Sequence, residues 1–318
     1  MTANTLAGRD LLTMADLTPA EVRLVLDRAL AHKDLWPRRA APRPTLAGKK
    51  AALVFMKPSL RTRVSFECAC ANLGIHPVVL GPHDAFSREE TVHDTVKTLE
   101  RYVDVIVLRT FEQAHVEEVA EHASVPVVNS LTDDHHPCQG LADLMTIEER
   151  FAKLAGLTLA YVGDGNNMAN TCLLAGALTG MHVRTASPDG YAPAAAVVEQ
   201  ARALAEAHVT GATIAVGADP AAAVAGADVV VTDTWASMGQ EAEHAERVAA
   251  FAGFTVDEPL FAQASEGAVF LHCLPAHRGE EVSPGVIDGA ASAVFDEAEN
   301  RLWAQQALLS LLLEGSES

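Results

Sequence analysis

A short basic segment, "KPSLRTR" at residues 57–63, carries two arginines, two hydroxyl side chains and a lysine directly after an apolar run. A helical pattern begins at about residue 64, so the segment is expected to connect a strand to a helix. Backbone N–H groups at a helix start attract anions, and arginine side chains suit phosphate in particular. The chain lacks the G-x-x-x-x-G-K-[ST] loop of nucleoside-triphosphate sites. We therefore predict a phosphate-type anion site formed by Ser59, Arg61, Thr62 and Arg63.

Polar or reactive side chains also follow several other apolar runs. In open parallel sheets, ligands bind outside the carboxyl ends of the strands, so these side chains are expected to gather near ligands. Arg109 is expected to approach the same anion as the basic segment, and His136 and Gln139 to add hydrogen bonds. Asn166 and Asn167 are expected either to cap a helix or to contact an amino-acid carboxylate. The residues concerned are Arg109, His136, Gln139, Asn166, Asn167, Asp233 and Cys273.

Two local patterns are similar to other kinds of site. The G-x-G at residues 163–165 follows a predicted strand, as in dinucleotide loops, but Met168 stands where the third glycine of G-x-G-x-x-G belongs. This break disfavours a nicotinamide dehydrogenase. The segments "HHPC" and "HCLPAH" contain histidine and cysteine without the recurrent ligand spacings of zinc sites. We therefore expect no metal site.

The apolar runs predict the elements that position these residues. Helical patterns at 15–35, 64–73, 90–102, 140–156 and about 297–313 accompany them, and strands alternating with helices indicate parallel sheets. The predicted fold class is α/β, with two doubly wound parallel-sheet domains joined by long helices. The expected domains are residues 1–140, with the helix of about 297–318 packing back on them, and residues 141–296. The expected strands are 51–56, 76–80, 103–108, 125–129, 157–163, 182–186, 212–216, 227–233 and 267–273.

Composition restricts the partners and the compartment. The 318 residues have a formal net charge of −19, which disfavours nucleic acid or an anionic membrane as a partner. The most apolar windows are too short to span a bilayer, and the first 17 residues lack a signal-peptide core. Five cysteines without a C-x-x-C pair argue against a disulfide framework, and four of them are expected to be buried. We expect a cytoplasmic protein.

Five motifs, in this order along the chain, resemble those of the aspartate/ornithine carbamoyltransferase family: "KPSLRTRVSFE", "HHPCQGLADLMTIEE", "DTWASMGQE", "HCLPAHRGEEV" and "VFDEAENRLWAQQALL". The patterns D-x-x-x-S-M-G and H-C-L-P are similar to the ornithine branch of that family. The resemblance implies a carbamoyl-phosphate domain followed by an ornithine domain, with no metal or organic cofactor. It also implies a homotrimer, or a multiple of trimers, with active sites between subunits. The implied reaction carries the carbamoyl group to the δ-amine of L-ornithine, which gives L-citrulline and phosphate.

The resemblance also implies roles for individual residues, with Arg61, Arg109, His136 and Cys273 at the reaction itself. The phosphate would be bound by Ser59, Arg61, Thr62 and the backbone of Leu60, with Arg109 reaching both the phosphate and the carbonyl oxygen. The carbamoyl group would be bound by His136, Gln139 and Arg301. Ornithine would be bound by Asn167, Asp233, Ser237 and Met238, with Cys273 and Leu274 near its side chain.

This chain departs from the family pattern at two positions. Leu60 stands where threonine is common, which removes one hydroxyl from the phosphate loop. Arg88 fits a basic position that a neighbouring subunit lends to the site, but Glu89 stands where glycine is frequent. Transfer to an N-acylated ornithine, a diamine or aspartate therefore remains an alternative. A non-catalytic protein that binds amino acids or phosphate on the same scaffold is another.

Overall fold

A computed structural model describes residues 4–35, 45–86, 90–236 and 244–315. The chain forms two compact units. Unit 1 comprises Met1–Met145 and Glu299–Ser318, and unit 2 comprises Thr146–Ala298. The boundaries between the units fall within two long helices, α5 (Pro137–Phe151) and α12 (Val294–Leu313).

Unit 1 contains a parallel sheet with the strand order β2-β1-β3-β4. The strands are β1 (Lys50–Phe55), β2 (His76–Leu80), β3 (Val105–Arg109) and β4 (Val127–Leu131). Their almost continuous aliphatic runs suit a parallel sheet with covered faces. The strand order reverses between β1 and β3, where Phe55 pairs with Arg109. Such a reversal point is where ligands bind in open α/β sheets.

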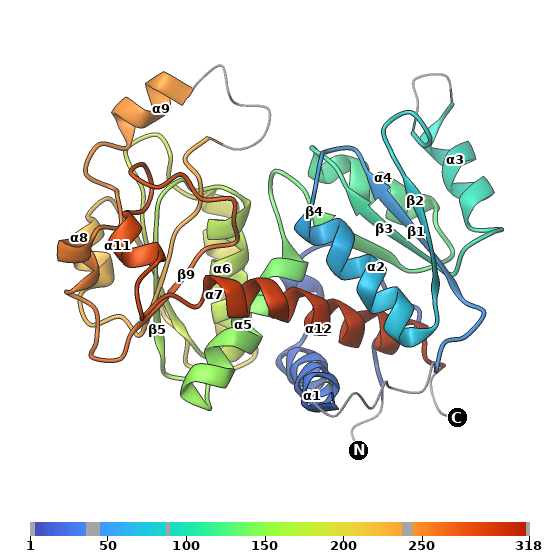
Figure 1. The fold of residues 1–318 in the computed structure, drawn as a ribbon, viewed down its shortest axis with the longest axis horizontal. Coiled ribbons are helices and arrows are strands. Elements are labelled where there is room, and N and C mark those ends of the chain that lie inside the picture. Colours follow the sequence, from blue (N-terminus) through green and yellow to red (C-terminus); the bar gives the residue numbers. More distant parts are fainter. Residues whose placement is uncertain (1–3, 36–44, 87–89, 237–243, 316–318) are drawn as a thin grey trace. The chain divides into compact units, whose positions relative to one another are not determined.

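Helices surround this sheet in Figure 1. They are α1 (Pro19–Leu35), α2 (Arg61–Leu73), α3 (Val92–Leu99), α4 (Gln113–His122) and the larger part of α12, with a 3-10 turn, η1, at Met14–Asp16. Helix α1 begins at Pro19 rather than residue 15, because the Thr18 N–H donates to Glu21 Oε2 at 2.9 Å and the Glu21 N–H donates to Thr18 Oγ1 at 3.3 Å. These reciprocal bonds form a capping box. The α12 segment of unit 1 lies beside α2, where Asn72 Nδ2 donates to Gln306 Oε1 at 2.8 Å.

Two predicted helix starts were three residues too late. Helix α2 begins at Arg61 rather than residue 64, and α5 begins at Pro137 rather than residue 140. The polar residues of the first turn interrupt the apolar period, so the period indicates a start that is too late. In α5, Pro137 fits the first helical position because an N–H there would have no partner within the helix. Arg61, Thr62 and Gln139 therefore lie on rigid helical turns rather than on loops.

Unit 2 contains a parallel sheet with the strand order β7-β6-β5-β8-β9. The strands are β5 (Thr158–Val162), β6 (His182–Ala186), β7 (Ile214–Gly217), β8 (Val229–Val231) and β9 (Val269–Leu271). The strand order reverses between β5 and β8, so the segments that follow these two strands lie at a ligand-binding position. All nine predicted strands are present in the described residues, and the α/β class with two parallel sheets is confirmed.

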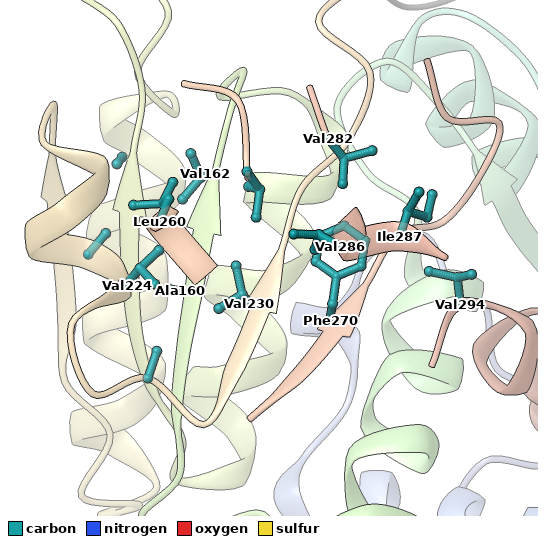
Figure 2. Packing of buried hydrophobic residues seen from close by; sticks show 14 residues of the cluster. Ala160, Val162, Val224, Val230, Leu260, Phe270, Val282, Val286, Ile287 and Val294 are labelled. Atoms are coloured by element: carbon teal, nitrogen blue, oxygen red, sulfur yellow. The ribbon is translucent and has the colours of Figure 1, made fainter. Parts of the chain in front are cut away.

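One face of the unit 2 sheet packs against short helices to form an apolar core. Figure 2 shows Val162, Val230 and Phe270 of the sheet among Val286 and Ile287, which come from a short helix. Burying each such side chain contributes about 1.5–3 kcal/mol. The helices are α6 (Asn167–Thr179), α7 (Ala195–Ala207), α8 (Pro220–Val224), α9 (His244–Ala250), α10 (Glu258–Phe261) and α11 (Pro284–Ile287).

Two further expectations from the sequence concern the burial of the cysteines and the absence of a membrane-spanning helix. Cys68 is exposed on α2, so the expectation that it is buried was wrong, whereas Cys70, Cys138 and Cys172 are buried. Position 68 faces outward because the helical period places the neighbouring Phe66, Ala69 and Cys70 inward. No helix among the described residues is both long enough and apolar enough to cross a bilayer.

Candidate active site

The basic segment after β1 ends in the first turn of α2. The Thr62 N–H donates to Ser59 Oγ at 3.3 Å, which folds the segment over the start of the helix. Thr62 is buried, whereas the Leu60 side chain is 76% exposed. The leucine that replaces the common threonine therefore places no hydrocarbon among the buried site groups. The Arg63 Nε donates to Glu67 Oε1 at 2.7 Å on the exposed face of α2, and the role of Arg63 as an anion donor stays a prediction.

A buried guanidinium joins the basic segment to the start of α5. Arg301, on α12, donates from Nη2 to Thr62 Oγ1 at 3.1 Å and from Nη1 to Gln139 Oε1 at 2.7 Å. Its Nη1 also lies 3.4 Å from His136 Nε2. Gln139 is held in turn because its Nε2 donates to Asp143 Oδ1 at 2.8 Å. Three segments that are distant in sequence thus meet at one arginine.

His136 is surrounded by cations. Burial and the neighbouring Arg301, Arg109 and Arg61 guanidinium groups lower the pKa of His136 well below its ordinary value. The imidazole is therefore neutral near pH 7. Because a guanidinium has only donors, the His136 Nε2 that faces Arg301 accepts, which places the imidazole proton on Nδ1. A buried site with three cations and a neutral donor suits an anion that bears a carbonyl group.

Arg109 is the last residue of β3 and is buried. Beside it, the buried Lys57 forms an ion pair with Asp133 and lies 4.2 Å from the centroid of the Phe111 ring. Burial lowers the pKa of Lys57, the Asp133 carboxylate opposes that shift, and the Arg109 charge adds to it. Lys57, which follows β1, thus contacts the segments that follow β3 and β4. Sequence reasoning did not identify this contact, although each partner follows a predicted strand.

In unit 2, the segments after β5 and β8 meet at Asp233. Asn166 caps α6, with its Oδ1 accepting from the Met168 N–H at 2.9 Å, and its Nδ2 donates to Asp233 Oδ2 at 2.9 Å. Cys273 Sγ donates to Asp233 Oδ1 at 3.2 Å. Asn167 is the first residue of α6 and is buried. The structure therefore brings together Asn166, Asp233 and Cys273, with Asn167 next to Asn166 in the chain, whereas Ser237, Met238 and Arg88 lie outside the described residues.

Leu274 has a left-handed backbone, with φ of 57°, which a branched residue rarely adopts. Its N–H donates to His272 Nδ1 at 2.9 Å, and His272 Nε2 lies 3.2 Å from Glu281 Oε1. Because Nδ1 accepts, the imidazole proton is on Nε2 and points to the carboxylate. His272 and Glu281 are fully buried. Their hydrogen bonds therefore fix the Cys273–Leu274 turn on its buried side. Sequence reasoning did not identify the pair, although both residues lie in "HCLPAHRGEEV".

Two groups of metal-ligand atoms lie close together in the described part of unit 2: Asp233, His272 and Cys273, and His277, Glu280 and Glu281. In the first group both nitrogens of His272 already have hydrogen-bond partners, so the imidazole is available to an ion only if one of those bonds breaks. The donor atoms of the second group lie within 4.8 Å of one another, but only Glu281 is buried. The absence of a metal site stays a prediction.

The G-x-G at 163–165 has a packing explanation. A Cβ atom on Gly165 would lie 2.3 Å from the backbone of Ala192 and Pro193, and the Gly165 N–H donates to Tyr191 O at 2.7 Å. Gly163 has φ of 146°, a conformation that favours glycine. Gly165 is therefore required by a close backbone approach and Gly163 by its backbone conformation, whether or not a dinucleotide binds.

Comparison with known proteins gives a consistent result over almost the whole chain. Residues 9–149 match the carbamoyl-P binding domain of aspartate/ornithine carbamoyltransferase, and residues 155–312 match its Asp/Orn binding domain. The ornithine carbamoyltransferase of Anoxybacillus flavithermus is 53% identical over 309 residues, which cover 97% of this chain and 98% of the relative. That of Acidothermus cellulolyticus is 52% identical over 309 residues, covering 97% of each.

A solved structure agrees with these sequence relatives. The structure of ornithine carbamoyltransferase from Pyrococcus furiosus superimposes with a TM-score of 0.94 at 46% identity, covering 99% of both chains. The matched regions include the cationic cluster of unit 1 and the Asp233 cluster of unit 2. The chain belongs to the aspartate/ornithine carbamoyltransferase family.

Proposed function

We propose that this protein is an enzyme that transfers the carbamoyl group of carbamoyl phosphate to the δ-amine of L-ornithine, giving L-citrulline and phosphate. The observation that carries the proposal is the group of three arginines around the neutral, buried His136. It supplies positive charge for a phosphate and hydrogen-bond donors for a carbonyl oxygen. The relatives named ornithine carbamoyltransferase, at about half identity over nearly full length, support ornithine as the acceptor.

In unit 1, the phosphate is bound by Ser59, Arg61, Thr62 and the Leu60 backbone N–H at the start of α2. A helix N-terminus suits this role because its first N–H groups lack partners within the helix. Arg109 spans the phosphate and the carbonyl oxygen. The carbamoyl group contacts His136, Gln139 and Arg301, which already lie in hydrogen-bond contact or within 3.4 Å of one another.

In unit 2, Asp233 binds the α-ammonium group of ornithine, and Asn167 hydrogen-bonds its α-carboxylate. Ser237 and Met238 complete this end of the site as the family motif implies. Cys273 and Leu274 lie near the δ-amine. The Cys273 thiol orients Asp233 through their 3.2 Å contact and forms no covalent intermediate.

The reaction begins when the neutral δ-amine attacks the carbonyl carbon. A tetrahedral oxyanion forms, the C–O bond to phosphate breaks, and the departing phosphate takes the proton from the amine nitrogen. Arg109, His136 and Thr62 stabilise the oxyanion, and losing one such donor typically costs about 3–4 kcal/mol. Holding both substrates in line supplies roughly 7–11 kcal/mol more. Because the amine must lose a proton, activity is expected to rise from neutral to alkaline pH.

We further propose that the protein is cytoplasmic and assembles as a homotrimer or a multiple of trimers. Arg88 is then a candidate contribution to the site of a neighbouring subunit. Its motif position supports this assignment, which size-exclusion chromatography with light scattering and an Arg88→Ala variant would test. A monomer with full activity would exclude a shared site.

Carbamoyl transfer from carbamoyl phosphate to a panel of amines, with the N-carbamoyl product of each amine identified, tests the function. The panel is ornithine, N-acetylornithine, putrescine and aspartate, with release of phosphate measured in parallel. Citrulline and phosphate in equal amounts from ornithine alone are expected. Turnover with another amine only would overturn the choice of acceptor. Carbamoyl-phosphate binding without turnover of any amine would favour a binding protein on the same scaffold.

A further inference from the structure

One buried arginine in unit 2 contacts both segments that carry the Asp233 cluster. Arg247 lies on α9, and its side chain is almost fully buried. Its Nη1 donates to Asp164 Oδ2 at 2.8 Å and to the Trp235 carbonyl oxygen at 3.0 Å. Asp164 belongs to the segment after β5, and Trp235 belongs to the segment after β8. A single guanidinium therefore bridges the two segments.

The same two segments are joined at Asn166 and Asp233. Asn166 lies two residues after Asp164, Asp233 lies two residues before Trp235, and Asn166 Nδ2 donates to Asp233 Oδ2 at 2.9 Å. Thr232 Oγ1, next to Asp233, also donates to the Val162 carbonyl oxygen at 2.6 Å. A further point that fixes the separation between the Asn166–Asn167 turn and the Asp233 carboxylate is Arg247. Removing that point frees the two segments to shift against each other.

The surroundings of Arg247 favour an arginine over other residues. Its Cζ lies 5.2 Å from the centroid of the Tyr191 ring, and Tyr191 and Trp235 both contact the Phe251 ring, at centroid distances of 4.9 and 5.4 Å. A planar guanidinium can stack on a ring while it donates to two acceptors, which a lysine ammonium does less well. Burial raises the pKa of Asp164 and the Arg247 charge opposes that shift, so the carboxylate depends on this partner.

We infer that Arg247 is a positioning residue for the amino-acid substrate: it holds the Asp164 and Trp235 segments at the spacing that ornithine requires without touching the substrate. This inference rests on the proposed function, because it takes Asn167 and Asp233 as the ornithine contacts. It predicts a selective effect. Ornithine recognition depends on Arg247, whereas carbamoyl-phosphate binding in unit 1 does not.

Steady-state kinetics of Arg247→Met and Arg247→Lys test the inference, with carbamoyl-phosphate affinity measured by calorimetry. For Arg247→Met we expect the KM for ornithine to rise roughly 10- to 100-fold, the scale of a misplacement of about 1 Å. Carbamoyl-phosphate affinity should stay within about twofold. Arg247→Lys should give an intermediate KM, since an ammonium keeps the charge beside Asp164 but not the planar fork. Arg278→Met is the matched control, because it removes an exposed ion pair of unit 2 with Asp288 and should leave both constants unchanged.

The possible results separate the inference from a general loss of folding. If Arg247→Met is too unstable to assay, Arg247→Met/Asp164→Asn removes the unpaired buried charge, and the raised KM must persist in this folded double variant. An unchanged ornithine KM in either variant would overturn the inference, as would an equal loss of affinity for both substrates. Failure of the wild-type protein to use ornithine would instead overturn the proposed function.

Discussion

Replacing Arg301 with methionine should separate carbamoyl-phosphate binding from the rest of the protein. The guanidinium contacts Thr62 Oγ1, Gln139 Oε1 and His136 Nε2 at 3.1, 2.7 and 3.4 Å. A methionine fills most of the same space but donates no hydrogen bond. The change therefore removes the cationic partner shared by α2, α5 and α12 and leaves the apolar packing of α12 largely intact.

The contacts set the size of the expected effect. A hydrogen bond from a charged group contributes about 1.5–3 kcal/mol, so losing the one that Arg301 gives the carbamoyl group weakens carbamoyl-phosphate binding roughly 10- to 150-fold. The Gln139 and Thr62 acceptors also lose their donor, and each buried group left unsatisfied costs about 1–3 kcal/mol. Gln139 is restrained from turning away because its Nε2 is bound to Asp143. A lower melting temperature should accompany the weaker binding.

Calorimetry with carbamoyl phosphate, together with thermal unfolding, provides the assay. Arg28→Met is the control, because Arg28 binds Ser310 on the same helix α12 and Glu314 directly after that helix, outside the cationic cluster. This control should change the melting temperature without changing the carbamoyl-phosphate affinity. An Arg301→Met variant with wild-type affinity would refute the assignment of Arg301 to the carbamoyl end. An equal loss of affinity in Arg28→Met would show that the effect is not local.

Three other predictions follow from the described contacts. Leu60→Thr should change the KM for carbamoyl phosphate by less than about threefold, because the side chain at position 60 is 76% exposed, and a tenfold change in initial-rate kinetics would contradict this. Burial and the Arg28 charge lower the pKa of His32 from 6.5 to about 4 in the folded protein. Between these two pH values His32 is protonated in the unfolded chain but not in the folded one, so stability falls as the pH drops from about 6.5 towards 4. At pH 5 the free energy of unfolding is lower by at most about 2 kcal/mol. In urea unfolding, His32→Gln should weaken the fall of this free energy with decreasing pH. A pH dependence equal to that of the wild type would contradict the prediction. Gly165→Ala should lower the melting temperature by several degrees, because its Cβ would clash with the backbone of residues 192–193, and a variant as stable as wild type would exclude that approach.

The strands could be read from the sequence because each is a short aliphatic run between polar segments. The starts of α2 and α5 were read less well, since their first turns carry the polar residues of the site. A residue such as Arg61 interrupts the apolar period on which a helix prediction depends. The polar residues of the candidate site are therefore the ones that obscure where these two helices begin.

Contacts between distant segments could not be derived from spacing. Arg301 meets Thr62 across 239 residues, and only the family resemblance pointed to it. Nothing in the local pattern distinguishes Arg247 from an exposed helical arginine, because its burial depends on how α9 packs against the Asp164 and Trp235 segments. Tertiary packing decides which of several arginines become part of a site.

An isotope experiment shows which nitrogen of ornithine receives the carbamoyl group. Carbamoyl phosphate labelled with 13C at the carbonyl is mixed with ornithine labelled with 15N at the δ position only, and the product is followed by NMR. We expect a one-bond 13C–15N coupling in citrulline, formed at the rate of phosphate release. A 13C label bonded to the unlabelled α-nitrogen, or phosphate release without a 13C–15N bond, would contradict it.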